Sequence, residues 1–117
     1  MKIQYCSDLH LEVLTNDAWI KRNPIIPVGD ILIIAGDTSY LDESFKELDF
    51  LKQVSDNFRQ TYIIPGNHEF YRGYDVSACE GQINEDILSN VKLIHNDIAY
   101  EEGIKLIFST MWSRIAD

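Results

Sequence analysis

The chain has 117 residues, of which 45% are hydrophobic and 25% charged, a composition that fits one folded domain and excludes disordered and fibrous proteins. Ten basic and nineteen acidic residues give a net charge of −9. That charge disfavours binding to extended nucleic acid or to anionic membrane, and it suits a protein that holds cations.

Strands alternate with helices in the predicted amino-terminal half. Short apolar runs predict the first strand at Ile3–Cys6, the second at Ile31–Ala35 and the third at Tyr62–Ile64. A short helix is expected at Asn16–Arg22, and apolar residues at spacings of three and four predict an amphipathic helix over Leu41–Phe58. This alternation is typical of layered α/β folds, in which the three strands would be parallel neighbours.

One further helix and three more strands are predicted in the carboxyl-terminal half. The helix is predicted from the spacing of four apolar residues, Val76, Cys79, Ile83 and Ile87. The strands are expected at Val91–Ile94, Ile98–Tyr100 and Lys105–Phe108, with a turn at Glu102-Gly103. His95 falls between two of these strands, where we expect a solvated hairpin loop.

The sequence gives no sign of a signal peptide, a membrane-spanning segment or a disulfide framework. The first residues lack the apolar region of a signal peptide, and the longest aliphatic run, Ile31–Ala35, is too short to cross a bilayer. Two cysteines, Cys6 and Cys79, provide no disulfide framework, and we expect both to be buried as small hydrophobic residues. These features predict a cytoplasmic protein.

Each of the three amino-terminal strands ends in polar residues. The first runs into Asp8-Leu9-His10, the second into Gly36-Asp37 and the third into Gly66-Asn67-His68-Glu69. Ligands bind beyond the carboxyl ends of parallel strands, so we expect two carboxylates, an imidazole and an amide oxygen to converge there. Gly29-Asp30 resembles the second block but precedes its strand, and we interpret Asp30 as a turn residue.

The donors in these blocks predict a centre for two divalent metal ions. Asp8 and His10 lie two residues apart, so an extended backbone would point both at one ion. Asp37 has two oxygens and can bridge two ions, and Asn67 adds a neutral oxygen. Nitrogen and oxygen donors without a thiolate suit Mn²⁺, Fe or Zn²⁺. Two adjacent ions would clamp a phosphoryl group and convert a bound water to hydroxide.

The three blocks resemble the first signature blocks of the calcineurin-like metallophosphoesterase superfamily. The stretch Lys105–Ser113 also resembles a bacterial branch that opens with the run Ser-Asp-Leu-His-Leu-Glu. The resemblance implies a hydrolase that cleaves a phosphate mono- or diester by metal-bound hydroxide on a two-metal centre.

The resemblance also implies a role for each residue in these blocks. Asp8 and His10 would bind the first metal ion, Asp37 would bridge both ions, and Asn67 would bind the second. His68 would be catalytic, lying beside the scissile phosphate and protonating the leaving group. The next residue, a glutamate, would be a hydrogen-bond partner behind the ligands.

The sequence departs from the family pattern after the third block. The family completes its site with a further histidine and a Gly-His-x-His block, whereas this sequence has three histidines and only His95 follows His68. The resemblance therefore implies an α/β fold, namely the N-terminal half of the family's four-layer sandwich, with a mixed sheet flanked by helices. We expect a single, incomplete and truncated domain over residues 1–117.

Several consequences of that incompleteness are expected. The metal site would lack ligands, activity would be impaired, and the chain would self-associate through its uncovered sheet face. The alternatives are a metal-free scaffold that binds a protein partner and an inactive truncated remnant. Metal content after purification distinguishes the enzyme from the scaffold.

Overall fold

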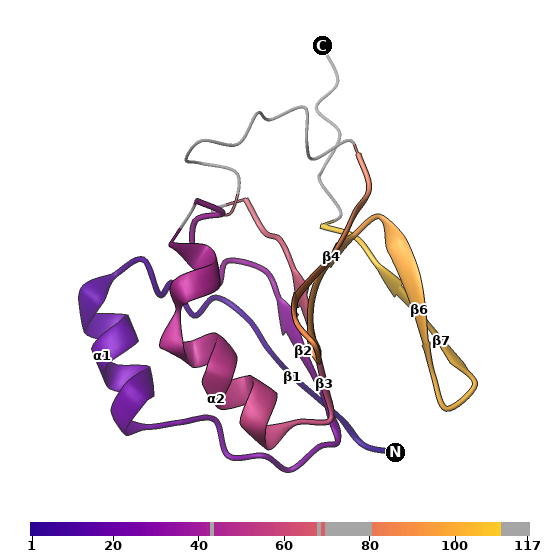
Figure 1. The fold of residues 1–117 in the computed structure, drawn as a ribbon, viewed down its shortest axis with the longest axis horizontal. Coiled ribbons are helices and arrows are strands. Elements are labelled where there is room, and N and C mark those ends of the chain that lie inside the picture. Colours follow the sequence, from indigo (N-terminus) through magenta and orange to yellow (C-terminus); the bar gives the residue numbers. More distant parts are fainter. Residues whose placement is uncertain (43, 68, 70–80, 111–117) are drawn as a thin grey trace.

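A computed structural model describes residues 1–42, 44–67, 69 and 81–110 (Figure 1). Its strands are β1 (Ile3–Cys6), β2 (Ile31–Ala35), β3 (Gln60–Ile64), β4 (Ile83–Leu88), β5 (Val91–His95), β6 (Asp97–Glu101) and β7 (Ile104–Phe108). Its helices are α1 (Leu14–Arg22), the short 3-10 helix η1 (Phe45–Glu47) and α2 (Asp49–Asn57).

Five strands form one mixed sheet in the order β1-β2-β3-β5-β4, and β6 and β7 form a separate hairpin. The pairs β1–β2, β2–β3 and β3–β5 are parallel, while β4 runs antiparallel to β5 at the sheet edge. Helices α1 and α2 lie on one face of the sheet, and the β6–β7 hairpin lies on the other (Figure 1). The predicted α/β class, with three parallel amino-terminal strands and a mixed sheet flanked by helices, is confirmed.

Strand β2 is apolar along its whole length, as is typical of a strand that is covered on both faces of its sheet. On the helix side, Leu32 and Ile34 of β2 belong to the same buried cluster as Phe50 of α2. On the hairpin side, Ile31 packs with Phe108 of β7 in a second cluster. This double coverage fixes the ends of the strands that carry the polar blocks.

The helix predicted from Val76, Cys79, Ile83 and Ile87 is wrong in its second half, where residues 83–88 form strand β4. Ile83 pairs with His95 and Glu85 with Leu93 in an antiparallel ladder with β5. Ile83 and Ile87 are four residues apart, and an even spacing places both on one face of a strand as readily as on one face of a helix. The first half of that predicted helix, 75–80, lies outside the described residues.

The long helix predicted over Leu41–Phe58 is interrupted. Leu48 adopts an extended backbone with φ −62° and ψ 123°, which separates η1 from α2. Four of the residues in the predicted pattern, Phe45, Leu51, Val54 and Phe58, are nevertheless buried, so the apolar face is largely confirmed even though the helix is not continuous.

The hairpin follows its predicted turn, because Glu102 and Gly103 have φ of 50° and 79° and two positive φ values are what a tight two-residue hairpin turn requires. His95, in contrast, is not solvated. It is the last residue of β5 and only 1% exposed, and its Nδ1 lies 3.0 Å from the Thr110 hydroxyl. The predicted solvated loop at His95 is therefore wrong.

Strand β1 leaves apolar side chains exposed on the hairpin side of the sheet. Cys6 packs against the helix-side cluster, so the alternating residues Ile3 and Tyr5 project from the other face, where they are 40% and 80% exposed. Self-association through this face stays a prediction. Within the described part of the chain, no helix is both long and apolar enough to span a bilayer.

Candidate metal centre

The loops that follow β1 and β2 run side by side beyond the ends of these strands. The backbone N–H of Asp8 donates to the carbonyl of Gly36 at 3.0 Å, and that of His10 donates to the carbonyl of Asp37 at 2.9 Å. The pairing of β1 with β2 thus continues into the polar blocks. It sets the position of Asp8 and His10 relative to Asp37.

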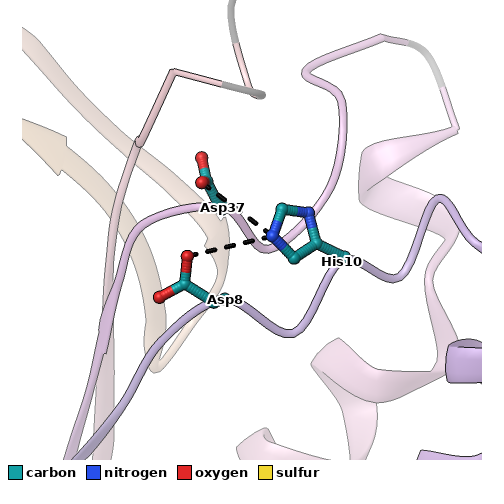
Figure 2. Close-up of side chains that lie close together, drawn as sticks. All are labelled: Asp8, His10 and Asp37. Atoms are coloured by element: carbon teal, nitrogen blue, oxygen red, sulfur yellow. Dashed lines mark ion pairs between the residues drawn. The ribbon is translucent and has the colours of Figure 1, made fainter.

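Asp8, His10 and Asp37 point toward one another at the carboxyl edge of the sheet (Figure 2). One ligand atom from each lies within 4.8 Å of the others. His10 Nε2 is 3.8 Å from Asp8 Oδ1 and 4.0 Å from Asp37 Oδ2. Ligand atoms bound about 2.0–2.2 Å from one ion stand roughly 3–4 Å apart, so the three side chains need to close by less than about 1 Å to share a divalent ion.

The three donors also have unusual backbone conformations. Asp8, His10 and Asp37 have φ of 58°, 48° and 55°, in the left-handed region that residues other than glycine rarely adopt. Each such conformation costs about 1 kcal/mol or more. Five residues other than glycine have positive φ in the described part of the chain, and three of them are these donors.

Two glycines allow the close approach of the β2 and β3 loops. Gly36 has φ 90°, and a Cβ added there would lie 3.2 Å from the Cα of Gly66. A Cβ added to Gly66 would lie 2.3 Å from Asp37 Oδ1, far inside any normal contact distance. The glycine at 66 is therefore required for the Asp37 carboxylate to occupy its position.

Glu12 fixes the orientation of the His10 ring. His10 Nδ1 donates to Glu12 Oε1 at 3.0 Å, and this leaves Nε2 toward Asp8 and Asp37. The bond to Glu12 raises the pKa of His10, the charges of Glu12, Asp37 and Asp8 add to the effect, and partial burial opposes it. A carboxylate behind a metal-binding histidine is a common supporting arrangement.

Glu69 holds the backbone around Asp37. Its buried carboxylate accepts the N–H of Thr38 at 2.7 Å through Oε1, and those of Gly66 and Asp37 at 3.0 and 3.1 Å through Oε2. Burial raises the pKa of Glu69 to about 7, although the accepted N–H groups act to lower it. Glu69 thus ties the β2 loop to the β3 loop, and its role as a partner behind metal ligands stays a prediction.

The structure brings together three of the five predicted site residues. Asn67 is half-buried and directly follows Gly66 at the same edge of the sheet, and its role as a ligand stays a prediction. His68 lies outside the described residues, so its catalytic role also stays a prediction. Asp30 lies before β2, at the opposite end from the site, where it accepts the N–H of Lys2 at 2.8 Å.

Sequence reasoning assigned no role to Glu12. The available signal was its position two residues after His10, which repeats the spacing between Asp8 and His10. That signal is weak by itself, because the same spacing of two residues occurs throughout any extended segment.

The donor set fits a divalent metal ion. Two carboxylates and one imidazole suit Mn²⁺, Fe or Zn²⁺, whereas a calcium site would use oxygen ligands throughout. In the absence of a cation, the two carboxylates would also repel each other and any phosphate group brought near them.

Comparison with known proteins supports the same chemistry. The profile of the calcineurin-like phosphoesterase family matches residues 1–109. The "uncharacterized protein L509" of Acanthamoeba polyphaga mimivirus is 29% identical over 133 aligned positions, which cover 98% of this chain and 45% of that protein. The chain therefore spans less than half the length of this curated relative. No solved structure matches the chain significantly.

Proposed function

Because the chain belongs to the calcineurin-like phosphoesterase family, we propose that it provides metal ligands for the hydrolysis of a phosphate mono- or diester. The observation that carries this proposal is the meeting of Asp8, His10 and Asp37, whose ligand atoms lie within 4.8 Å of one another. The intact donors and their strained backbone favour a metal centre over a metal-free scaffold.

The proposed centre takes two divalent ions, Mn²⁺, Fe or Zn²⁺. Asp8 and His10 would hold the first, Asp37 would be shared, and Asn67 would hold the second. Ions bound there would withdraw charge from the phosphoryl oxygens and lower the pKa of bound water. The site would be incomplete in this chain, since the sequence has three histidines and no Gly-His-x-His block.

The remaining residues of the site would position groups and move a proton. In the neutral imidazole of His10, Glu12 would hold the proton on Nδ1, and this would leave the lone pair of Nε2 directed at the ion. Glu69 would keep the Asp37 loop in place through its three backbone contacts. His68 would donate a proton to the leaving-group oxygen.

The test combines metal binding with hydrolysis. Purified chain is titrated with Mn²⁺ by calorimetry and then assayed with p-nitrophenyl phosphate, a monoester, and bis(p-nitrophenyl) phosphate, a diester. We expect Mn²⁺ to bind and one of the two esters to be hydrolysed slowly. The preferred ester separates monoesterase from diesterase activity.

The structure offers a matched pair of variants for this test. Asp37→Asn removes a carboxylate of the proposed centre, whereas Asp30→Asn makes the same change in a second Gly-Asp pair at the other end of β2. We expect Asp37→Asn to weaken Mn²⁺ binding at least tenfold and Asp30→Asn to leave it unchanged. If neither the unmodified chain nor the Asp30→Asn variant binds a divalent metal ion, the proposal is contradicted and the metal-free scaffold is favoured.

A further inference from the structure

We propose that a pocket beside Asp8 binds a flat aromatic ring carried by the substrate, so that the preferred phosphate ester is an aryl phosphate or a nucleotide. This inference rests on the proposed function, because it places the ring next to the same metal centre. The pocket belongs to the segment between β1 and α1 and to α1 itself.

The pocket has a volume of about 240 Å³. It is lined by Asp8, Leu9, Leu11, Asn16, Trp19 and Ile20. Asp8 is a donor of the candidate metal centre as well as a lining residue. A phosphate held at the metal centre would therefore carry its attached group toward the pocket.

The lining combines two polar side chains, Asp8 and Asn16, with aliphatic side chains and one large aromatic ring. Leu11 and Ile20 are 4% and 5% exposed, whereas Trp19 is 57% exposed. An indole ring that remains this exposed can stack on a second flat ring and bury apolar area on both.

The pocket is braced by the loop that carries the metal donors. The side-chain amide of Asn16 donates to the carbonyl of His10 at 3.1 Å and to that of Leu9 at 3.4 Å. The start of α1 is thereby tied to the backbone between Asp8 and Leu11. This connection sets the position of the pocket relative to the metal donors before any ligand arrives, which lowers the cost of binding.

Volume and charge limit the ligand further. An apolar cavity of about 150 Å³ holds one benzene ring, so 240 Å³ admits a single ring or a fused pair, including a nucleobase. The Asp8 carboxylate and the net charge of −9 disfavour a ring with a negative substituent. The structure thus favours a neutral flat ring.

The experiment compares ligands with and without a ring. Phenyl phosphate, adenosine 5′-monophosphate and the ring-free control glycerol phosphate are titrated into the Mn²⁺-loaded chain by calorimetry. We expect the first or second to bind more tightly than glycerol phosphate. A preference for phenyl phosphate identifies an aryl ester, and a preference for the nucleotide identifies a nucleoside ester.

Two variants assign the preference to the pocket. Trp19→Ala should weaken binding of the preferred ring-bearing ligand by about twofold to tenfold and leave glycerol phosphate unchanged, while Trp19→Phe should retain most of the affinity. Tyr100→Ala, which removes another exposed aromatic side chain from strand β6, is the matched control and should change neither. Fluorescence of a Trp112→Phe variant, in which Trp19 is the remaining tryptophan, should be quenched by the ring-bearing ligand.

Failure of this inference can be told from failure of the proposed function. If Mn²⁺ binds and the three ligands bind equally well, or if Trp19→Ala weakens all three alike, the ring pocket is refuted and the metal centre stands. If Mn²⁺ does not bind at all, the proposed function is refuted, and the inference that rests on it is refuted too.

Discussion

Replacing Gly66 with alanine should displace the Asp37 carboxylate and so impair the metal centre. The added Cβ would lie 2.3 Å from Asp37 Oδ1, 2.9 Å from its Cγ and 2.7 Å from its backbone N. Ordinary contacts between such atoms are about 3.5 Å, so the carboxylate would have to move by roughly 1 Å. Both the side chain and the backbone of Asp37 are affected, and rotation of the side chain alone would not relieve the clash.

The expected magnitudes follow from this displacement. Overpacking of this kind costs about 1–3 kcal/mol in the free energy of unfolding. Misplacement of a ligand by its supporting groups typically weakens metal binding by about 10- to 100-fold. Gly103→Ala is the matched control, because its φ of 79° strains an alanine by about 1 kcal/mol while no atom lies within 4 Å of the new Cβ.

The assay measures both quantities for each variant. Urea unfolding should show lower stability for Gly66→Ala and for Gly103→Ala, whereas calorimetric titration with Mn²⁺ should show lower affinity for Gly66→Ala alone. The control thus separates loss of stability from loss of the site. Mn²⁺ affinity equal to that of the unmodified chain in Gly66→Ala would refute the argument that Gly66 sets the position of the Asp37 carboxylate.

Three further predictions concern side chains in and beyond the centre. Glu12→Ala should weaken Mn²⁺ binding by about 10- to 100-fold, because His10 loses the partner that orients its ring, and unchanged affinity by calorimetry would contradict this. Burial raises the pKa of the Cys6 thiol from 9.0 to about 11, so less of it is thiolate at pH 8. In a Cys79→Ser variant, Cys6 should therefore react with a disulfide reagent at pH 8 about 100-fold more slowly in the folded than in the unfolded chain. Equal rates in the two states would refute this prediction. An accepted backbone N–H lowers the pKa of Asp30, so its carboxylate stabilises the fold above the ordinary value of 3.8, and this contribution is lost as the pH falls through the lower folded value. An NMR titration of Asp30 with a midpoint at or above 3.8 would contradict that expectation.

The location of the site could be predicted from the sequence because it depends on topology. Parallel strands bring their carboxyl ends to one edge, so two polar blocks after two neighbouring strands are enough to place Asp8, His10 and Asp37 together. Glu12 could not be assigned in this way, since its contact with His10 is a local one between side chains two residues apart.

The errors in the fold have equally specific physical causes. An apolar spacing of four at Ile83 and Ile87 is compatible with a helix and with a strand, and tertiary pairing with β5 decided between them. His95 was expected in solvent because polar residues follow it in the chain. It is buried because β5 continues one residue beyond Ile94, with Thr110 packed against the imidazole.

The most direct test of the proposed metal centre is whether His10 binds a metal ion through nitrogen. Mn²⁺-loaded chain can be examined by pulsed electron paramagnetic resonance, which detects coupling between the ion and an imidazole nitrogen. If His10 is a ligand, the unmodified chain should show a nitrogen coupling and His10→Gln should lose it. Mn²⁺ that binds without nitrogen coupling, or a coupling that persists in His10→Gln, would contradict the claim that Asp8, His10 and Asp37 form the metal centre.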